Sequence, residues 1–587
     1  MKENIYRTHH CCDIDASMVG EKIVVSGWIE NIRDHGGVLF LDLRDNTETL
    51  QTVSNDDSLF MGLAKESVIK LTGVVRKRDE ATYNNRLKTG EVELLVETLE
   101  VLSASLHDLP FSIMTSKDAN EDVRLKYRYL DMRNSKVKEN IKLRSDVLHF
   151  LRNKMYDLGF MEVQTPILTA SSPEGARDFV VPSRNFKGKF YALPQAPQIY
   201  KELLMVGGVE KYFQVAPCFR DEDARRDRTL EFYQLDLEMS YVTEEEVLEV
   251  GEEIFYDVFT KFSSKKVSPM PFRRIAYRDA MEMYGTDKPD LRNPLVIQDA
   301  TEILKDTTFG PFKKSIIKAI VVDDIGDKSN SWFNELVDYA SSIGMPGIGY
   351  LTLMSDGTFK GPIDKFLSND ERDMLVKNLE MKENSVIFFI ANKRKKIAQK
   401  FAGQIRDELG RKLDLIDKDK LELCIIKDFP MFEYDEETKK YEFCHNPFSL
   451  PHGGISDYEK YENVEDILAY QYDFVCNGNE MASGAIRNHD LDSLAKGFEV
   501  VGYTRDEIET RFSSIFTAFK YGCPPHGGMA PGIDRILMLI KDEPNLREVQ
   551  AFPTSASGAD NMMGSPSELT RMQLKELGIK IEVKKDE

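Results

Sequence analysis

The 587-residue chain lacks several features that would place it in a special class of protein. It has no run of about 18 apolar residues, so we expect no membrane-spanning helix and no membrane partner. Its N-terminus, MKENIYRTHHCCDIDASM, has no apolar core of a secretory signal, so we expect a cytoplasmic protein. The seven cysteines form no CxxC pair, which argues against both a disulfide framework and a zinc ribbon.

Excess positive charge is also missing, because 99 acidic residues outnumber 78 basic ones and the net charge is −21. This acidity argues against a protein that coats nucleic acid nonspecifically, and we expect no DNA partner. RNA can still be bound through local basic and aromatic patches. The length is enough for several hydrophobic cores, so we expect three or four domains.

Residues 1–105 alternate short β runs with turns, which predicts a small barrel of the OB type. Phe40 shares the polar face of one strand, with Arg33 and Gln51 expected nearby. An aromatic ring among polar groups suits a stacked base, although a half-exposed Phe is the simpler interpretation from these residues alone. The strands are expected at 23–29, 38–44, 68–75 and 92–101.

The stretch FQVAPCFRDEDARRDRTLEFYQLDLEMSY, residues 213–241, predicts two strands joined by a charged loop. An Arg beside carboxylates, as in Arg220-Asp221-Glu222, can clamp a phosphate while an acid reads an amino group. By itself, a solvated charge cluster is the simpler interpretation. Strict alternation predicts a core face formed by Leu235, Leu237, Met239 and Tyr241. The opposite face carries Phe232, Gln234, Asp236 and Glu238.

The segments before and after residues 213–241 show patterns of secondary structure. An apolar stripe predicts a helix over 139–158, followed by a strand over 160–165 that ends at Pro166. Gln198 and Lys201 lie three residues apart, so they share one face of the next expected helix. Polar residues over 106–138 predict a hinge. Residues 286–422 predict a mixed α/β insertion, in which no catalytic constellation is evident.

Asn477-Gly478 predicts a tight β-hairpin in which Val475 lies opposite Glu480. Asp473 is then the diagonal neighbour of Glu480, and two carboxylates so placed can hold Mg²⁺ or can equally be solvated. Arg487 requires a bulge near Ser483-Gly484 to share their face. Further on, the glycines of GGMAPGIDRIL, residues 527–537, precede an expected core helix.

In this order, these segments resemble the class II aminoacyl-tRNA synthetases, and in particular the bacterial-type aspartyl-tRNA synthetases. The helix and strand over 139–166 are similar to motif 1, FRDED…R.DR..EF.QLD.E to motif 2, and GGMAPGIDRIL to motif 3. The resemblance implies an α+β multidomain protein with an OB-fold anticodon-binding barrel, 1–105, and a hinge, 106–138. It also implies a catalytic domain with an antiparallel sheet, formed by 139–285 and 423–587 and interrupted by the α/β insertion over 286–422.

The resemblance implies that ATP and Mg²⁺ are required, with Arg220 and Arg535 as the catalytic residues. Arg220 matches the ligand of the α-phosphate and the substrate carboxylate, and Arg535 the ligand of the γ-phosphate. Phe232 matches the ring stacked on adenine. The implied ATP-binding set is Arg220, Asp221, Glu222, Phe232, Glu480, Gly532, Ile533, Asp534 and Arg535. The implied metal ligands are Asp473 and Glu480.

For the amino acid, the resemblance implies L-aspartate. Lys201 and Arg487 match contacts to its side-chain carboxylate, and two cations favour aspartate over asparagine. The chain departs from the family at Ala196, Thr229 and Asn446, where Ser, Gln and His are common. The implied aspartate-binding set is Glu174, Gln198, Lys201, Arg220, Asp236, His445 and Arg487.

The resemblance also implies tRNA-Asp as a partner and a homodimer through motif 1. Phe40 matches a residue that stacks on an anticodon base and Gln51 one that reads it, with Arg33 and His35 alongside. His35 is associated with family members that also charge tRNA-Asn, whereas Leu is associated with strict members. We therefore hypothesise dual tRNA specificity; a neutral loop residue in a strictly discriminating enzyme is the alternative.

Other functions share parts of this pattern. A lysyl or asparaginyl synthetase shares the architecture, but Lys201, Arg487 and the insertion favour aspartate. A catalytically silent, RNA-binding paralogue would not need Arg220, Asp473 and Arg535. An adenylate-forming amide ligase would not need an anticodon-type barrel.

Overall fold

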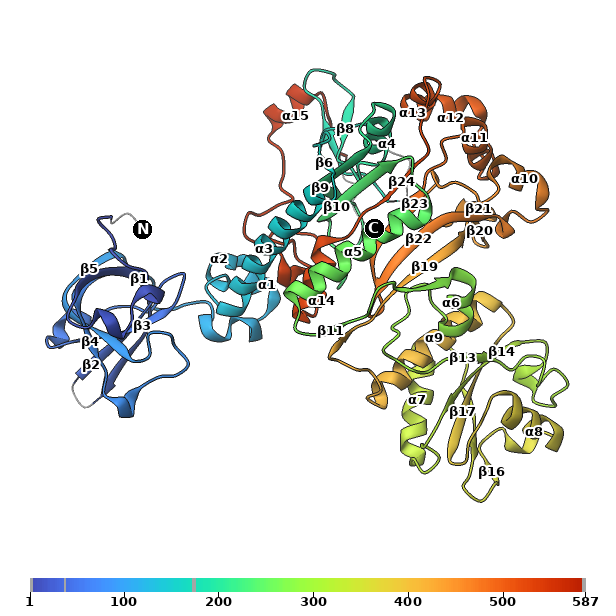
Figure 1. Cartoon of the computed structure of the whole chain (residues 1–587), viewed down its shortest axis with the longest axis horizontal. Helices are drawn as coiled ribbons and strands as arrows, with labels where there is room; N and C mark the ends of the chain where they lie inside the picture. Colours follow the sequence, from blue (N-terminus) through green and yellow to red (C-terminus); the bar gives the residue numbers. More distant parts are fainter. Residues whose placement is uncertain (1–3, 36–37, 172–175, 583–587) are drawn as a thin grey trace. The chain divides into compact units, whose positions relative to one another are not determined.

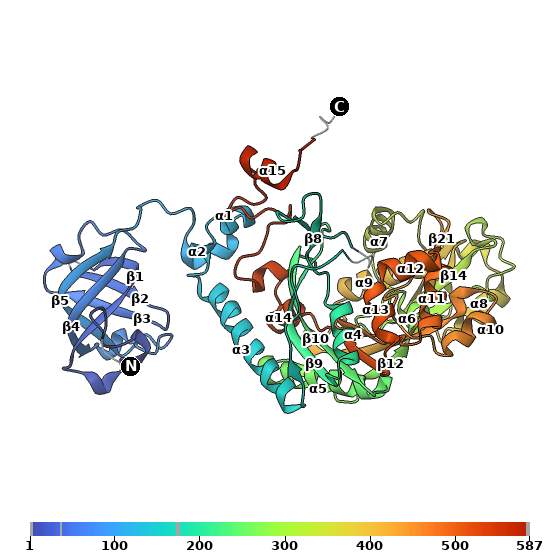
Figure 2. The ribbon, with the colours of Figure 1, turned by 90° about the horizontal axis from the view of Figure 1, so that it is seen from above.

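The computed structural model describes residues 4–35, 38–171 and 176–582. Contacts within the chain divide it into two units, residues 1–119 and residues 120–587. Figures 1 and 2 show the first unit in blue. No helix among the described residues is long and apolar enough to cross a membrane.

The first unit contains a closed five-stranded barrel, which confirms the predicted OB-type architecture. The order of strands around the barrel is β1-β2-β3-β5-β4. Sequence reasoning misses β3, because TLQTVS shows no apolar alternation and is buried along most of its length. The strands are β1 (Lys22–His35), β2 (Val38–Arg44), β3 (Thr49–Ser54), β4 (Val68–Lys77) and β5 (Val92–Ser103).

An eight-stranded sheet forms the centre of the second unit (Figure 1). Its order is β12-β19-β22-β23-β24-β10-β9-β6, and the six inner strands pair antiparallel, which confirms the predicted antiparallel sheet. Only the edge strands, β12 and β6, pair parallel with their neighbours. The strands are β6 (Met161–Glu162), β9 (Lys211–Phe219), β10 (Glu231–Ser240), β12 (Arg273–Ala276), β19 (Leu423–Pro430), β22 (Leu468–Cys476), β23 (Asn479–Ile486) and β24 (His526–Met529).

The two faces of this sheet have different chemistry. Leu235 and Leu237 of β10 pack with Phe255 of α5 in the main hydrophobic core. The alternate residues Asp236 and Glu238 therefore point to the other face, where α4 contacts β10. The helices that pack around the sheet are α3 (Ser135–Asp157), α4 (Gln198–Val206), α5 (Glu244–Phe262) and α14 (Ile533–Lys541).

Two local predictions for this sheet are wrong. Tyr241 does not join the core face, because β10 ends at Ser240 and Tyr241 adopts a φ of 58° that turns the chain, leaving it 68% exposed. The strand expected over 160–165 is reduced to the two residues of β6. The preceding helix forms as α3 and buries Leu151 and Met155 as expected.

The insertion forms a five-stranded sheet of order β13-β14-β17-β15-β16, which is the predicted mixed α/β structure. Side chains of α7 and α9 pack on one face, and those of α8 on the other. Figure 1 shows this part in yellow and yellow-green. Its elements are β13 (Ile297–Asp299), β14 (Ile316–Val322), α7 (Asn330–Ser342), β15 (Gly349–Leu353), β16 (Phe359–Lys360), α8 (Asn369–Asn378), β17 (Ser385–Asn392) and α9 (Lys395–Lys412).

The segment expected as a hinge contains two short helices, α1 (Glu121–Lys126) and α2 (Arg128–Asp131). Arg124 is buried and binds the carboxylates of both Asp131 and Glu548, which fixes this segment to the C-terminal part of the second unit. Some of its polar residues, Arg124, Arg128 and Asp131, therefore form a buried ion-pair network, which composition alone does not distinguish from a linker.

The remaining elements surround the central sheet. Helices α11, α12 and α13 share a small apolar core of their own. These elements are β7 (Val180–Pro182), β8 (Phe190–Ala192), β11 (Lys266–Val267), α6 (Tyr277–Tyr284), β18 (Lys420–Leu421), β20 (Phe432–Asp435), β21 (Lys440–Phe443), α10 (Asp457–Lys460), α11 (Leu491–Val500), α12 (Arg505–Arg511), α13 (Ser513–Phe519) and α15 (Arg571–Leu577).

Candidate active site and nucleic-acid interface

A cavity of about 530 Å³ lies on the face of the sheet that α4 contacts. Residues of α4, β10, the β22–β23 hairpin and the start of α14 line it. Segments far apart in the sequence thus meet around one space. Twelve of the predicted site residues line it: Gln198, Lys201, Arg220, Glu222, Phe232, Asp236, His445, Glu480, Arg487, Gly532, Asp534 and Arg535.

Four buried charges lie at the floor of the cavity, of which Lys201, Asp236 and Arg487 line it and Glu238 lies behind them. Lys201 Nζ lies 2.8 Å from Asp236 Oδ1 and 3.2 Å from Glu238 Oε2. Arg487 donates to both oxygens of Glu238, from Nε at 2.9 Å and from Nη2 at 3.1 Å. Burial disfavours the charge of Glu238, but Arg487 and Lys201 hold its pKa at about 2. The floor therefore consists of two cations and two anions in fixed positions.

Some polar atoms of the residues that line the cavity have no hydrogen-bond partner within the part of the chain that the structure describes. They include two donors, Arg487 Nη1 and Arg220 Nε, and one acceptor, Asp236 Oδ2. Buried polar atoms are normally paired, so unpaired ones beside a cavity indicate what a ligand must supply. The donors fit carboxylate or phosphate oxygens, and the acceptor fits an ammonium group.

An aromatic platform lies beside these charges. The guanidinium carbon of Arg220 is 5.0 Å from the centre of the Phe232 ring, and both side chains line the cavity. Glu222 lines it as well and accepts a hydrogen bond from Arg228 at 3.1 Å. A flat ring beside a guanidinium, with a carboxylate lining the same cavity, is suited to stack a base and read its edge.

The predicted hairpin has the predicted register at its turn. Asn477 and Gly478 both have positive φ, 51° and 78°, and Val475 lies opposite Glu480. The bulge needed to bring Arg487 to the cavity does not lie near Ser483-Gly484, because the register already shifts after Glu480, where Met481 is the extra residue. One extra residue in β23 moves every later side chain of that strand to the other face of the sheet, including Arg487 just after its end.

Beyond this turn, a lysine from the start of the insertion reaches the hairpin. Lys288 Nζ lies 2.8 Å from Glu480 Oε2, and Arg535 lies 3.5 Å from the other oxygen, Oε1. Burial works against the charge of Glu480, yet these two cations hold its pKa at about 2. The carboxylate that the sequence assigns to a metal is therefore paired with a side-chain cation in this structure.

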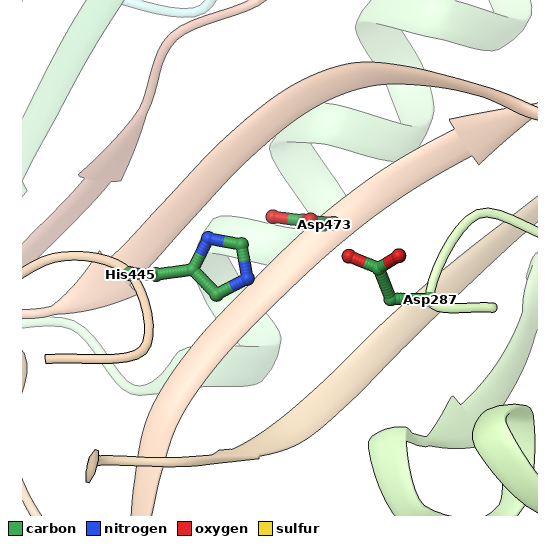
Figure 3. Close-up of side chains that lie close together, drawn as sticks. All are labelled: Asp287, His445 and Asp473. Carbon is green, nitrogen blue, oxygen red and sulfur yellow. The ribbon is translucent and has the colours of Figure 1, made fainter. Parts of the chain in front are cut away.

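Asp473 faces a second group of ligand atoms. Side-chain atoms of Asp287, His445 and Asp473 all lie within 4.8 Å of one another, and Figure 3 shows the three side chains converging. Asp473 is buried, and its Oδ2 has no partner in the described ranges. Burial, together with the nearby charge of Glu480, raises the pKa of Asp473 to about 7. Oxygen ligands of this kind fit Mg²⁺.

The barrel of the first unit presents a separate polar face. Arg33 lies opposite Phe40, and Asp42 lies opposite Gln51 on the next strand. Arg33 donates to Asp42 at 2.5 Å and to Gln51 at 3.2 Å, and the His35 ring makes an edge contact with Phe40 at 5.7 Å. The structure therefore brings together all four predicted anticodon residues on one surface.

The family model for class II tRNA synthetases (D, K and N) matches residues 120–556. This chain belongs to that family. The model for OB-fold nucleic acid binding domains matches residues 23–102 of the same synthetase.

Relatives cover nearly the whole synthetase. The protein from Ehrlichia ruminantium (strain Gardel), named "Aspartate--tRNA(Asp/Asn) ligase", is 48% identical over 98% of this chain and 99% of its own length. Proteins with the same name from Rickettsia akari (strain Hartford) and Wolbachia pipientis wMel are 49% and 48% identical, and each also covers 98% of this chain. The matches cover 97% of the Rickettsia akari protein and 100% of the Wolbachia pipientis protein.

Solved structures confirm the fold. The asparaginyl-tRNA synthetase of Pyrococcus horikoshii, complexed with asparaginyl-adenylate, has a TM-score of 0.56 at 19% identity and covers 94% of this chain and 98% of its own. A putative aspartyl-tRNA synthetase from Leishmania major Friedlin has the same TM-score and identity, with 94% and 95% coverage. The predicted family and fold class are thus confirmed.

Three of the predicted active-site residues that the structure describes do not line the cavity. Asp473 lies in the cluster of Figure 3 instead. Asp221 pairs through its backbone with Arg177, and Ile533 is fully buried in the main core, so that a contact from Ile533 to ATP would have to come from its backbone. Glu174 lies outside the described residues.

Sequence reasoning also missed residues of the site. The insertion was expected to carry no catalytic constellation, but Lys288 lines the cavity and Asp287 joins the cluster of Figure 3. No local pattern reveals this, because their partners lie almost 200 residues away in the sequence. Glu202 was missed as well, although its spacing of four residues from Gln198 places both on one face of α4.

Proposed function

We propose that this synthetase attaches L-aspartate to tRNA-Asp through an aspartyl-adenylate, with ATP as the second substrate, and that it also charges tRNA-Asn with aspartate. The pair of buried cations in the cavity floor, Lys201 and Arg487, is the observation that carries the amino-acid assignment. The name of the relatives, Aspartate--tRNA(Asp/Asn) ligase, supports both tRNAs.

The chemistry of the floor favours aspartate over its closest competitors. Arg487 Nη1 and the ammonium of Lys201 can donate to a side-chain carboxylate, whereas the amide nitrogen of asparagine would face them with further donors. A lysine side chain would bring a third cation. Asp236 Oδ2 supplies an acceptor for the α-ammonium group.

In the first step, an oxygen of the aspartate α-carboxylate attacks the α-phosphorus of ATP and pyrophosphate leaves. The synthetase needs no protein nucleophile for this displacement. Arg220 binds the α-phosphate and the attacking carboxylate, Phe232 and Glu222 hold the adenine, and Arg535 binds the γ-phosphate. Positioning and neutralisation of the developing charge then account for the rate.

Mg²⁺ fits the carboxylates at the hairpin, since Asp473 has a buried oxygen with no partner in the described chain and Glu480 lines the cavity. When bound there, the ion neutralises phosphate charge. Lys288 lies 2.8 Å from Glu480 Oε2, so an ion bound to that oxygen competes with the lysine. Asp287 and His445 are the neighbouring ligand candidates.

In the second step, a ribose hydroxyl of the terminal adenosine of the tRNA attacks the mixed anhydride and AMP leaves. The barrel selects the tRNA, with Phe40 stacking on an anticodon base and Gln51 reading it. His35 contacts the edge of Phe40, so its identity can influence which anticodon base is accepted. The dual specificity itself is supported by the name of the relatives.

We also infer a homodimer that acts in the cytoplasm. The motif 1 region exposes large apolar side chains at the end of α3 and just after it: Tyr156, Met161, Ile167 and Leu168. Such a cluster supports a protein interface. Light scattering should give twice the chain mass, and a monomer at micromolar concentration would argue against the dimer.

Pyrophosphate exchange into ATP tests the amino-acid assignment. The assay uses purified protein with aspartate, asparagine or lysine, each without tRNA. We expect exchange with aspartate at least about 100-fold faster than with the other two, because either competitor leaves the buried donors without a carboxylate partner. Exchange with asparagine or lysine instead would reassign the substrate, and no exchange with any of the three would favour a silent paralogue.

A further inference from the structure

A line of buried polar contacts runs behind the cavity wall. Asn446 Nδ2 donates to Gln198 Oε1 at 3.4 Å, and Gln198 Nε2 donates to Glu202 Oε1 at 2.5 Å. The second oxygen of Glu202, Oε2, lies 3.5 Å from Nε2 of His526. Gln198, Glu202 and His526 are all buried, and only Gln198 and Asn446 line the cavity.

These contacts define which end of the Gln198 amide faces which neighbour. An ionised carboxylate only accepts hydrogen bonds, so Glu202 must face the amino group of Gln198. Asn446 is fixed in turn, because its Oδ1 accepts from the backbone N–H of Phe448 at 2.9 Å and its amino group is left to face Gln198 Oε1. The amino group of Gln198 therefore faces Glu202, and its carbonyl oxygen faces Asn446, which lines the cavity.

We propose that Glu202 is a positioning residue for the amino-acid substrate: it holds the Gln198 amide with its oxygen available to the substrate ammonium. The inference rests on the proposed function, in which Gln198 contacts that ammonium group. Glu202 itself lies behind the wall and touches no substrate. A glutamine at this position could offer either an oxygen or an amino group, and the Gln198 amide would then lose its unique orientation.

The charge of Glu202 has a matching buried cation. Nδ1 of His526 lies 2.8 Å from the carbonyl oxygen of Pro524, and Nε2 faces Glu202, so both ring nitrogens face acceptors. The contact at Nε2 is an ion pair at 3.5 Å and not a hydrogen bond, and the doubly protonated ring is the form that suits acceptors on both sides. Burial opposes this charge, but Cys523 and Glu202, with Glu238 nearby, raise the pKa of His526 to about 10.

This arrangement differs from a buried ion pair that only stabilises the fold. An ion pair of that kind would affect stability and all substrates alike, whereas a device that orients Gln198 acts on the ammonium contact alone. The two roles therefore separate in steady-state kinetics, in which KM for aspartate and KM for ATP are measured independently.

The test compares Glu202→Gln with the full-length wild type in pyrophosphate exchange. We expect KM for aspartate to rise about tenfold, because a hydrogen bond to a charged group is weakened, while kcat and KM for ATP change less than about twofold. Glu252→Gln is the matched control. Glu252 is also buried and accepts hydrogen bonds from Phe272 and Arg274, but it lies on α5, away from Gln198. This control should lose stability and keep the wild-type KM for aspartate.

A double-mutant cycle with Gln198→Ala decides whether Glu202 acts through Gln198. The orienting role requires that Glu202→Gln has no further effect on KM for aspartate once Gln198 is alanine. If Glu202→Gln does not fold, Asn446→Ala releases the other end of the same amide. Asn446→Ala should raise KM for aspartate about threefold or more when Gln198 is present and should have no effect on it in Gln198→Ala.

Three results would overturn the inference. They are an unchanged KM for aspartate, an equal rise in KM for ATP, and an effect of Glu202→Gln that persists without Gln198. Wild-type protein that shows no exchange with aspartate would instead refute the proposed function, so the two failures are distinguishable.

Discussion

Arg487 binds Glu238 through Nε and Nη2, at 2.9 and 3.1 Å, and its third nitrogen, Nη1, has no partner within the described part of the chain. The internal carboxylate thus fixes the guanidinium plane and leaves one donor for a ligand. A guanidinium can do both at once because its donors form a rigid fork, whereas an ammonium is a single point of charge.

Replacement of Arg487 by lysine should therefore remove aspartate activation. Lysine keeps the charge that Glu238 needs but cannot bind Glu238 and the substrate carboxylate in the same geometry. We expect kcat/KM for aspartate in pyrophosphate exchange to fall at least about 100-fold. Arg274→Lys is the matched control, because Arg274 binds buried Glu252 in a similar fork far from the cavity. Equal losses in both variants would contradict a role in substrate binding.

Removal of the Lys288 ammonium group should strengthen the binding of Mg²⁺ in the absence of ATP. Lys288 pairs with Glu480 at 2.8 Å, so the ion and the lysine compete for this carboxylate. We expect Lys288→Met to lower the Mg²⁺ concentration that gives half of the thermal shift, by about threefold or more. Lys382→Met, which removes a lysine paired with Asp323 at the exposed surface of the insertion, should leave it unchanged. A higher midpoint would mean that Lys288 assists the ion.

Truncation of Phe40 should weaken tRNA binding without touching adenylate formation. Stacking on one base contributes about 1–3 kcal/mol, so KM for tRNA should rise about tenfold or more in Phe40→Ala. Pyrophosphate exchange without tRNA should be unaffected, because Phe40 belongs to the barrel and the cavity residues all lie in the second unit. A loss of exchange would show that the two units do not act separately.

The buried imidazolium of His526 should make stability depend on alkaline pH. Its pKa in the folded chain, about 10, lies above the ordinary 6.5, so the folded protein binds the proton more tightly than the unfolded chain. The stabilisation is complete below about pH 6.5 and is lost as the pH rises towards 10. We expect Tm to fall less over this range in His526→Gln than in the wild type. Parallel Tm curves would contradict a charged His526.

Local patterns were reliable where few residues decide the geometry. Asn477-Gly478 sets the register of its hairpin, because a two-residue turn with positive φ at both positions admits one pairing at the turn. Strand alternation placed Leu235 and Leu237 in the core and Asp236 on the cavity side. It failed at Tyr241, since nothing in the pattern indicates that the strand ends at Ser240.

The parts of the site that depend on long-range contacts could not be predicted. Lys288 reaches Glu480 only because the start of the insertion folds back onto the hairpin. Met481 bulges where the sequence suggested a later position. Glu202 was within reach of reasoning from helix geometry, but the buried partner that explains its charge, His526, lies more than 300 residues further on.

Aminoacylation with radiolabelled aspartate, using separate tRNA-Asp and tRNA-Asn transcripts, tests the central claim most directly. The proposed function predicts that the wild-type synthetase charges both transcripts. It also predicts that His35→Leu, which changes the ring contact to Phe40, keeps tRNA-Asp and loses most of the charging of tRNA-Asn. Charging of tRNA-Asp alone by the wild type would contradict dual specificity, and charging of neither would contradict the assignment as an aspartate-specific synthetase.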